Sequence, residues 1–317
     1  MRYPLLALPI LCAFEASALT FKSGQSIHGG DAAIAITPEV IEACASDYFT
    51  QGTSAQTLQA MSFNIRYDNP SDGKNNWQYR IPKVTAIFNK HDVDFGGLQE
   101  VLHHQLGDLE KVLPAYEFVG VGRDDGKTQG EYAPIFFRKA DFTLLNSDTI
   151  WLSETPDKVG SRGWDAALPR ITSFATLRHN ASGAKILLGS AHYDHRGKGA
   201  RRNSGDVIHD YITKALAADD IEMVVLAGDF NDTPNSSTTK AIENKNCLFD
   251  ARRMAQEKSG PNSTWNGFRS VAAYERLDYI FTNPATPILS HVIDDSKIDG
   301  RFPSDHLPVI ISVGAPQ

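Results

Sequence analysis

The sequence predicts one compact α+β domain, in which two mixed β-sheets pack face to face and helices cover their outer sides. Many short apolar runs with strand character occur along the chain, and only a few segments between them show helical spacing. A purely parallel βαβ fold would need a helix after nearly every strand. Hairpin-like pairs of strands alternate here with occasional helices, so the sheets are expected to be mixed and mostly antiparallel.

The predicted elements follow one another from residue 38 to residue 313. Strands are expected where short runs of apolar or β-branched residues are bounded by polar or glycine-rich turns, as in 224–227, VVLA. Helices are expected where apolar residues recur every three or four positions, as in 80–91. The predicted strands are 61–66, 93–100, 117–120, 134–137, 142–145, 173–178, 185–191, 224–227, 276–281, 289–293 and 309–313. The predicted helices are 38–49, 80–91, 101–113, 206–217 and 238–243.

The length and charge of the chain narrow the class of protein. Its 317 residues, 41% of them hydrophobic, fit one large globular domain or two small ones. The formal net charge of −7 argues against a generally basic nucleic-acid-binding protein. A nuclease is still compatible with this charge, because a local basic cleft can exist on an acidic protein.

The first residues predict a secretory signal peptide. Arg2 is followed by a short apolar run, 3–14, and then by Ala16-Ser17-Ala18, which matches the A-x-A pattern of a cleavage site. The run is too short to span a membrane, and no second run of spanning length follows it. We therefore expect cleavage after residue 18, a secreted product without stable membrane insertion, an N-terminal extension at 19–59 and the folded domain at 60–317.

Removal of the signal peptide would leave two cysteines, Cys44 and Cys247. In an oxidising compartment such a pair favours a disulfide, which would join the extension to the domain. Two buried thiols are the alternative, and the sequence leaves both open. Sequons for N-glycosylation are also present, and they begin at Asn180, Asn235 and Asn262.

The stretch 224–234, VVLAGDFNDTP, shows the pattern that points to function. Its apolar residues predict a buried strand, and Asp229 and Asn231 follow on alternate positions, so both side chains point the same way. On this stretch alone, a strand followed by an Asx turn is an equally good explanation. Other predicted strands end in the same way, however, and turns alone do not account for so many polar tips. These tips are Asn64, Glu100, His192 with Asp194, Asp229 with Asn231, Asp278, and Asp305 with His306.

The polar tips combine carboxylates, amides and imidazoles, without clustered cysteines. Oxygen ligands suit a hard cation such as Mg²⁺ or Mn²⁺ better than a zinc ion held by thiolates. Asp229 and His306 can act as a general base and as a proton donor or phosphate ligand, and Asn231 can orient water or stabilise an oxyanion. This set of groups predicts metal-assisted attack of water on a phosphorus ester.

Six motifs along the chain, SFNIR, LQE, AHYDH, GDFN, RLDYIF and PSDHLPV, resemble the endonuclease/exonuclease/phosphatase superfamily. The resemblance extends from about Met61 to Val313. The superfamily includes pancreatic-type deoxyribonucleases, apurinic endonucleases, deadenylases, inositol-polyphosphate 5-phosphatases and neutral sphingomyelinases. The resemblance implies a four-layer αββα sandwich, in agreement with the sheets and helices predicted from the pattern.

The resemblance also implies a separate role in hydrolysis for each of the polar residues at the strand ends. Glu100 would be the principal Mg²⁺ ligand, with Asn64 and Asp305 beside it on the metal side. Asp229 would orient or deprotonate the attacking water, and Asn231 would help to position this water and the phosphate.

The histidines of the motifs would contact the phosphate. By resemblance, His306 would bind a phosphate oxygen and stabilise the pentacovalent transition state, while Asp278 orients its ring. His192 matches a histidine of the superfamily. In this chain Ser190-Ala191 replace the Asn-Thr that usually precedes that histidine, so any role of that asparagine is absent.

Loop residues between the tips are expected to set substrate choice. Trp77 would either stack on a base or sugar, or pack beneath a long loop. Arg80, Arg170 and Arg196 are candidates for clamping phosphate, and Arg196 is the best placed because it follows the His192 motif. As surface arginines they would need no such function.

The leading prediction is a secreted, Mg²⁺-dependent phosphoesterase that hydrolyses phosphodiester bonds like a nuclease, or else phosphomonoester bonds. A lipid or inositol phosphate phosphatase, or a sphingomyelinase, is the alternative. A non-catalytic binding protein on the same fold and a glycosidase with paired carboxylates are less consistent with the amide and histidine tips. The expected partner is a phosphate-ester substrate, including a nucleic acid or nucleotide, and we expect a monomer.

Overall fold

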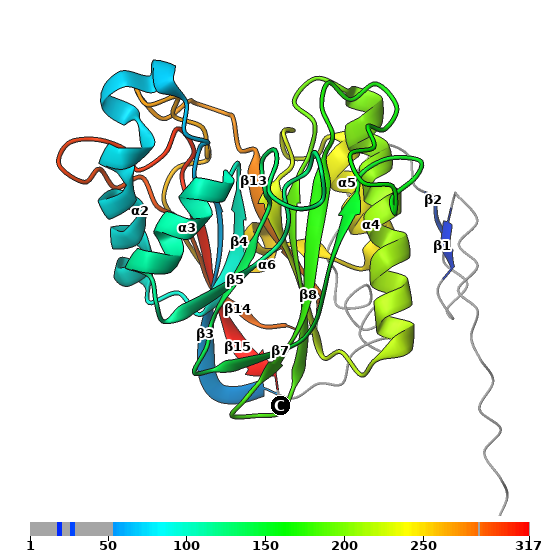
Figure 1. The fold of residues 1–317 in the computed structure, drawn as a ribbon. Helices are drawn as coiled ribbons and strands as arrows, with labels where there is room; N and C mark the ends of the chain where they lie inside the picture. The colour runs from blue at the N-terminus through cyan, green and yellow to red at the C-terminus, as the bar shows by residue number, and fades with distance from the viewer. Residues whose placement is uncertain (1–17, 21–25, 29–52, 285, 317) are drawn as a thin grey trace, which may run out of the picture.

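Two β-sheets lie face to face in the centre of the molecule, and helices cover the outer side of each (Figure 1). The computed structural model describes residues 18–20, 26–28, 53–284 and 286–316. The predicted α+β sandwich of two mixed sheets with outer helices is therefore confirmed. The helix predicted at 38–49 and Cys44 lie outside the described residues.

The first sheet has seven strands in the order β12-β14-β15-β3-β4-β6-β5. Its central strands β3 and β4 are parallel, whereas β15 runs antiparallel to β3. The strands are β3 (Thr53–Asn64), β4 (Phe95–Gln99), β5 (Tyr116–Val119), β6 (Ile135–Arg138), β12 (Glu257–Ser259), β14 (Ile288–Ile293) and β15 (Val309–Pro316).

The second sheet has six strands in the order β11-β13-β10-β9-β8-β7. Here β9 and β10 are parallel, and the other neighbours are antiparallel. The strands are β7 (Phe142–Trp151), β8 (Ile171–His179), β9 (Lys185–His192), β10 (Met223–Asp229), β11 (Phe249–Asp250) and β13 (Asp278–Thr282).

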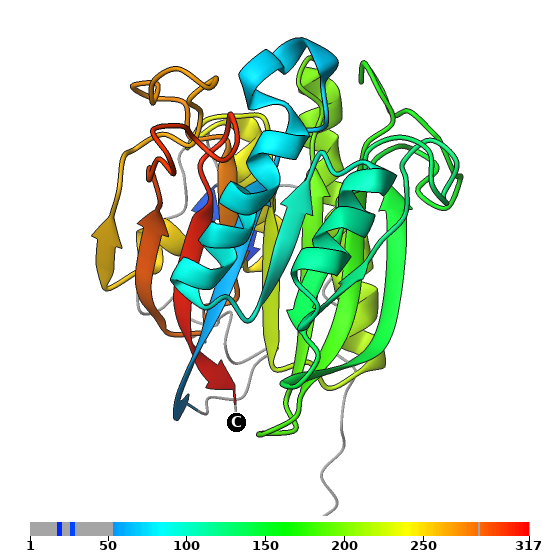
Figure 2. The ribbon, with the colours of Figure 1, turned by 60° about the vertical axis from the view of Figure 1, so that its left-hand side comes forward.

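The helices form the outer layers. α2 (Trp77–His91) and α3 (His103–Val112) cover the seven-stranded sheet, and α4 (Lys198–Ala218) and α5 (Ser237–Asn246) cover the six-stranded sheet (Figures 1 and 2). Within the described ranges, none of the helices is long and apolar enough to cross a membrane. The remaining short elements are η1 (Pro70–Asn75), α6 (Ala251–Met254) and an antiparallel pair of β1 (Ala18–Thr20) with β2 (Ser26–His28).

The alternation of side chains along β10 explains both the sandwich and the position of its polar tip. Val224 and Leu226 lie in the core beneath α4 and α5, whereas Val225 and Ala227 lie in the core between the two sheets. Because side chains alternate along a strand, Asp229 continues the inner row at the end of β10. The tip therefore lies between the sheets, where the inner row leaves the apolar core.

The two sheets approach each other closely at Gly97 of β4 and Ser190 of β9. A Cβ atom on Gly97 would lie 2.5 Å from Ser190 Oγ, so only glycine fits at this position. Ser190 Oγ donates a hydrogen bond to the carbonyl of Leu98 at 3.0 Å and accepts one from Gln99 Nε2 at 3.3 Å. The serine that replaces the usual asparagine of the histidine motif thus joins the two sheets.

Some elements are longer than their sequence patterns predict. β3 begins at Thr53 rather than at 61, and its early residues pair with β15, as Leu58 does with Val313. α4 begins at Lys198 rather than at 206. Its first turns bury polar or small residues such as Arg201 and Ser204, and these residues do not produce the apolar spacing that marks a helix.

Candidate active site

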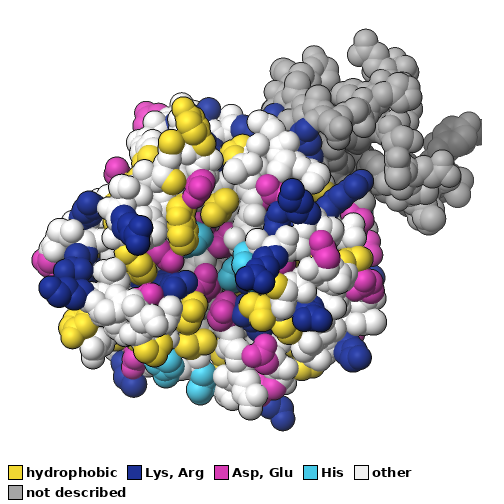
Figure 3. All heavy atoms as spheres, turned by 90° about the horizontal axis from the view of Figure 1, so that it is seen from above, with side chains coloured by type: hydrophobic (Ala, Val, Ile, Leu, Met, Phe, Trp, Pro, Cys, Tyr) yellow, Lys and Arg dark blue, Asp and Glu magenta, His cyan; other side chains and the backbone are white. Residues whose placement is uncertain are grey.

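The polar tips of both sheets meet at one end of the sandwich. Seen from above, acidic, basic and histidine side chains gather near the middle of this face (Figure 3). The seven-stranded sheet contributes tips next to β3, β4 and β15, and the six-stranded sheet contributes tips of β9, β10 and β13. The tips that the structure brings together are Asn64, Glu100, His192, Asp229, Asp278, Asp305 and His306.

Asn64 connects the two halves of this site. Its Nδ2 donates hydrogen bonds to Glu100 Oε1 and to Asp229 Oδ2, both at 3.0 Å, so one amide joins carboxylates from the two sheets. The second oxygen of Glu100 accepts a hydrogen bond from the backbone N–H of Tyr67 at 3.2 Å. The Oγ of Ser304 donates to the carbonyl of Asn64 at 2.7 Å, which holds the segment before Asp305 against the end of β3.

Three of these side chains form a compact group, and its two carboxylates, Glu100 and Asp229, fit a divalent cation. Ligand atoms of Glu100, Asp229 and His306 all lie within 4.8 Å of one another. Burial, and then the negative charge of Asp278, raise the pKa of Asp229 to about 7. Carboxylate oxygen donors suit Mg²⁺ or Mn²⁺. Asp305, predicted on the metal side, lies outside this group.

Asp278 and His306 form a buried pair. His306 Nδ1 lies 2.8 Å from Asp278 Oδ2, and its Nε2 lies 3.8 Å from Asp229 Oδ2. Burial opposes the charged imidazolium, but the carboxylates of Asp278 and Asp229 outweigh it and raise the pKa of His306 well above its usual value. The Trp265 ring meets the imidazole edge-on, with centroids 4.9 Å apart, and keeps it in place.

Arg170 connects the two histidines that follow β9 along the chain. Its Nη1 lies 2.9 Å from His192 Nε2, and its Nη2 lies 2.8 Å from His195 Nδ1. A guanidinium only donates, so His192 Nε2 is an acceptor and this ring is neutral. Burial and then the Arg170 charge lower the pKa of His192 well below its usual value, in agreement with a neutral ring. The other ring nitrogen lies 3.5 Å from Glu131 Oε2.

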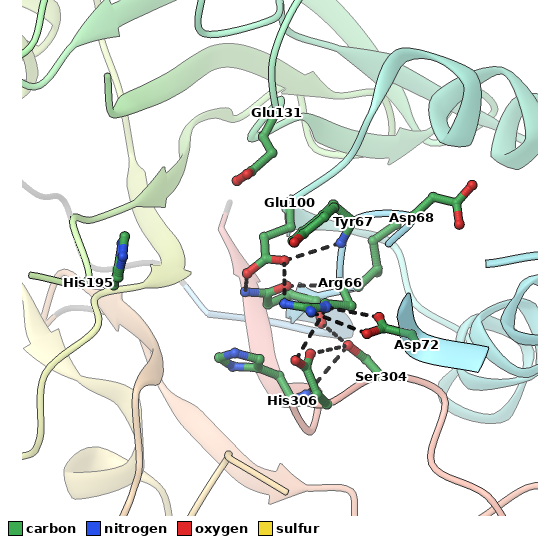
Figure 4. Close-up of polar contacts among 12 residues, drawn as sticks. Arg66, Tyr67, Asp68, Asp72, Glu100, Glu131, His195, Ser304 and His306 are labelled. Atoms are coloured by element: carbon green, nitrogen blue, oxygen red, sulfur yellow. Dashed lines mark hydrogen bonds and ion pairs between the residues drawn. The ribbon is translucent and has the colours of Figure 1, made fainter. Parts of the chain in front are cut away.

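Two charged residues at the site were not predicted from the sequence. Arg66 lies with Nη1 3.9 Å from Glu100 Oε2 and with Nε 3.7 Å from Asp305 Oδ2. Glu131 is held by Arg123 through hydrogen bonds of 2.7 and 2.8 Å. In Figure 4, Glu131 lies above Glu100 and Arg66. Arg66 belongs to the SFNIR motif, so the sequence could have indicated it. Glu131 precedes strand β6, whereas the sequence patterns indicated only residues that follow a strand.

Arg80 and Trp77 have structural contacts rather than the predicted substrate contacts. Trp77 is 2% exposed, and its Nε1 donates to Asp108 Oδ2 at 3.2 Å. Arg80 is 1% exposed, and its guanidinium donates to the carbonyls of Asn75 at 2.7 Å, Arg66 at 2.9 Å and Pro303 at 3.4 Å. Burial lowers the pKa of Arg80 to about 10, so it stays charged at neutral pH.

Trp77 therefore packs within the fold, which is the alternative to stacking on substrate, and the candidate phosphate-binding Arg80 is buried against backbone carbonyls. Arg80 instead ties the loop after β3 to the loop before Asp305, and both loops carry residues of the site. Arg196 is exposed, and its backbone N–H bonds Asp194 Oδ1 at 2.9 Å. Arg170, not Arg196, reaches the histidines.

Three site residues have left-handed backbone conformations. The φ angles are 59° for Arg66, 61° for Glu100 and 49° for Asn231. Such conformations cost residues other than glycine about 1–2 kcal/mol each. At Asn231 the turn is stabilised by its own N–H, which bonds Asp229 Oδ1 at 2.9 Å, and by its Nδ2, which donates to the Tyr193 carbonyl at 3.0 Å.

Comparisons with known proteins place this geometry among related folds. Residues 61–306 match the profile of the endonuclease/exonuclease/phosphatase family. The crystal structure of an endonuclease/exonuclease/phosphatase from Bacteroides vulgatus is 39% identical, with a TM-score of 0.78, and the match covers 82% of this chain and 100% of that chain. A mannosyl-6-phosphatase of Bacteroides thetaiotaomicron is 34% identical, with a TM-score of 0.76 and coverage of 81% and 99%.

More distant structures share the fold alone. TDP2 of D. rerio, complexed with a single-strand DNA product, is 19% identical over 82% of this chain and 100% of that chain, with a TM-score of 0.64. Among curated protein sequences, none matches this chain.

Proposed function

Since this chain belongs to the endonuclease/exonuclease/phosphatase family and is a hydrolase of phosphoester bonds, we propose that it uses Mg²⁺ to remove the phosphate group of a sugar phosphate. The observation that carries the metal-dependent chemistry is the approach of the Glu100 and Asp229 carboxylates, one from each sheet, to within 4.8 Å of each other beside His306. The choice of a sugar phosphate rests on the 34% identity to a mannosyl-6-phosphatase across 99% of that enzyme's chain.

Asp229 is the group that we assign to the attacking water. Its pKa of about 7, raised by burial and by Asp278, lets it accept a proton from water near neutral pH. The amide of Asn64 fixes one of its oxygens, and the backbone N–H of Asn231 fixes the other. A bound Mg²⁺ would neutralise charge that develops on the phosphate oxygens.

His306 and Arg170 are the cationic groups that we assign to the phosphate. His306 keeps its proton because Asp278 holds its Nδ1 at 2.8 Å, so its Nε2 can donate a hydrogen bond to a phosphate oxygen. Arg170 is held by Asp194 and lies against His192, whose Nε2 is 3.7 Å from Asp229 Oδ2. Cationic donors aimed at the phosphate would stabilise the charge of a pentacovalent transition state more than that of the substrate.

Hydrolysis of a nucleic-acid phosphodiester, the leading prediction from the sequence, is the second candidate. The ordered motifs of the superfamily favour it. The formal charge of −7 and the identity of 19% to the DNA-bound neighbour give it less support than the sugar phosphate has.

A substrate panel with purified protein tests the proposal. With Mg²⁺ present, we expect kcat/KM for mannose 6-phosphate or glucose 6-phosphate to exceed that for bis-(p-nitrophenyl) phosphate or single-stranded DNA. Chelation by EDTA should stop the reaction, and Asp229→Asn or His306→Asn should each lower kcat by about 10²–10⁴-fold. Exposed Lys214→Gln is the matched control and should leave kcat unchanged. Cleavage of DNA without release of phosphate from any sugar phosphate would replace the proposal with the second candidate.

We also propose that the protein is exported. The signal-like residues 1–18 support this proposal, and so does Cys247, which is disulfide-bonded. Its partner lies outside the described residues, as do both other cysteines of the chain, Cys12 and Cys44. N-terminal sequencing of the protein from its native host should find a mature chain that begins at Leu19, and an intact N-terminus would contradict the proposal.

A further inference from the structure

A second cleft lies at the edge of the six-stranded sheet, beside β11 and β13. Its volume is about 380 Å³, and a neighbouring hollow of about 530 Å³ shares Arg252 and Arg276 with it. The cleft adjoins the segments that carry the catalytic tips, since Pro234 follows the β10 tip and Arg276 precedes Asp278. The charged residues that line the cleft are Glu243, Asp250, Arg252, Arg253, Lys258 and Arg276.

Two of the cations in this cleft are balanced by carboxylates. Arg276 contacts both oxygens of Asp250, at 3.0 and 2.5 Å. Arg253 Nη1 contacts both oxygens of Glu243, at 2.7 and 2.8 Å. These pairs use both of the acidic residues in the lining, so the guanidinium of Arg252 and the ammonium of Lys258 form no ion pair with it.

Arg252 has only neutral hydrogen-bond partners in the part of the chain that the structure describes. Its guanidinium donates to Asn262 Oδ1 at 2.9 Å and to the Ser259 carbonyl at 3.5 Å, and it lies 3.3 Å from His291 Nδ1. Burial lowers the pKa of His291 to about 3, so this ring carries no charge. Burial, and then the charge of Arg276, lower the pKa of Arg252 itself. An anion bound here would offset the repulsion between the Arg252 and Arg276 guanidinium groups.

Lys258 is the second uncompensated cation. It is exposed on the short edge strand β12, and no carboxylate of a described residue lies within ion-pair distance of its ammonium group. Together with Arg252 it gives the cleft an excess of two positive charges on a protein whose formal charge is −7. The excess matches the charge of a phosphate dianion.

We infer that this cleft is a second anion site, separate from the catalytic cluster, which binds a phosphate group through Arg252 and Lys258. A guanidinium presents paired donors that match phosphate oxygens, and an ammonium adds a point charge. The amide of Asn235 in the lining supplies an uncharged donor. The phosphate is either free inorganic phosphate or a second phosphate on the substrate. The cleft itself is argued from its own contacts and does not depend on the proposed sugar phosphatase activity.

One segment connects this site to the catalytic one. Residues 262–278 begin at Asn262 in the neighbouring hollow, pass Trp265 against His306, and return through Tyr274 and Arg276 to Asp278. A phosphate in the cleft therefore contacts the same segment that packs on the catalytic histidine. A bisphosphorylated substrate held at both sites would be oriented by that segment.

Titration of inorganic phosphate into the full chain tests the site. Calorimetry in a His306→Asn background, with Mg²⁺ present, removes the catalytic histidine's share of binding. We expect Arg252→Gln to weaken the remaining phosphate binding at least about tenfold, in line with the loss of a charge-assisted bidentate contact. Lys258→Gln, which changes an exposed residue and is not expected to affect folding, should weaken it less, and Lys214→Gln should not change it. Equal phosphate affinity in the Arg252, Lys258 and Lys214 variants would overturn the inference.

Kinetics then distinguish the two sources of the phosphate. If the site holds a second phosphate of the substrate, Arg252→Gln should raise KM for glucose 1,6-bisphosphate at least about fivefold, equivalent to about 1 kcal/mol, and leave glucose 6-phosphate unchanged. If both KM values are unchanged while phosphate affinity falls, the ligand is free phosphate. A protein that hydrolyses neither sugar phosphate would contradict the proposed function. The calorimetric result would still show whether the second site binds phosphate.

Discussion

At the scale of single residues, three residues of the site have a left-handed backbone conformation that favours glycine. Arg66, Glu100 and Asn231 all have positive φ; the side chains of Arg66 and Glu100 lie in the cluster, and the backbone N–H of Asn231 bonds Asp229 in it. Hydrogen bonds stabilise these strained conformations, such as the bond from Tyr67 N–H to Glu100 Oε2. These residues sit where stability alone would favour another residue.

Glu100→Gly should show directly that the backbone conformation at this position costs stability. Both variants remove the carboxylate charge, but only glycine also removes the left-handed strain, so we expect metal-free Glu100→Gly to be more stable than Glu100→Gln by up to about 1 kcal/mol. Both variants should lose activity. Urea unfolding of the two proteins, measured side by side in EDTA, gives the difference, and a glycine variant less stable than the glutamine variant would refute the strain argument.

Asp194 predicts a dependence of stability on pH. Burial opposes its charge, but backbone N–H donors of Gly197, Arg196 and Ala167 outweigh burial and lower its pKa to about 2. A carboxylate with a lowered pKa stabilises the fold above its unfolded pKa of about 4 and loses this effect as pH falls towards 2. Asp194→Asn should therefore cost about 2 kcal/mol at pH 7 and progressively less below pH 4. Denaturant unfolding across this pH range checks it, and a cost that does not depend on pH would contradict it.

The residues of the site differ in how well the sequence reveals them. Asp229 and His306 follow apolar strand patterns directly, so alternation predicts where they point. Glu131 precedes its strand and is held by Arg123, a contact that depends on tertiary structure. Arg80 was predicted at the surface because arginine usually lies there, yet it is buried against backbone carbonyls of two loops.

At the scale of elements, the separation of the two sheets is set near the site by one missing side chain. Gly97 on β4 faces Ser190 on β9, and the tips of the same two strands carry Gln99 and His192. A change in sheet separation at this point would move the two halves of the catalytic cluster relative to each other.

Gly97→Ala should destabilise the fold by about 1–3 kcal/mol, because the new methyl group overlaps Ser190 Oγ and Cβ. It should also lower kcat, since the halves of the site would separate. Ser190→Gly removes both overlapping atoms, so the double variant should recover at least about 1 kcal/mol relative to the sum of the single changes. A double-mutant cycle that is additive in unfolding free energy would show that the two residues do not contact.

The elements also show what patterns of apolar residues cannot detect. The main strands and helices were predicted because their buried faces repeat every two or every three to four residues. The first turns of α4 were missed because they bury polar residues such as Arg201, whose Nη1 donates to the Asp194 carbonyl at 2.9 Å. η1 and α6 are too short for any periodicity to be visible.

At the scale of the whole molecule, metal binding should stabilise the sandwich. Glu100 belongs to the seven-stranded sheet and Asp229 to the six-stranded sheet, so a cation bound by both would hold the sheets together. We expect Mg²⁺ at a concentration of 100 times its Kd to stabilise the native state by about 2.7 kcal/mol and to raise the Tm. Calorimetry with and without EDTA measures this shift. Asp229→Asn should reduce the Mg²⁺ shift, and an unchanged shift in that variant would place the metal elsewhere.

The pairing of Thr53 with Pro316 has a consequence for how the domain can be connected. Both ends of the domain leave at the same point, on the side of the sandwich away from the catalytic tips (Figure 1). A short linker could join them, and new ends could be opened in the exposed turn at 181–183 between β8 and β9. We expect this circular permutant to keep kcat/KM within about tenfold of the natural order. For the same reason, a domain fused at either end would leave the catalytic tips accessible to substrate.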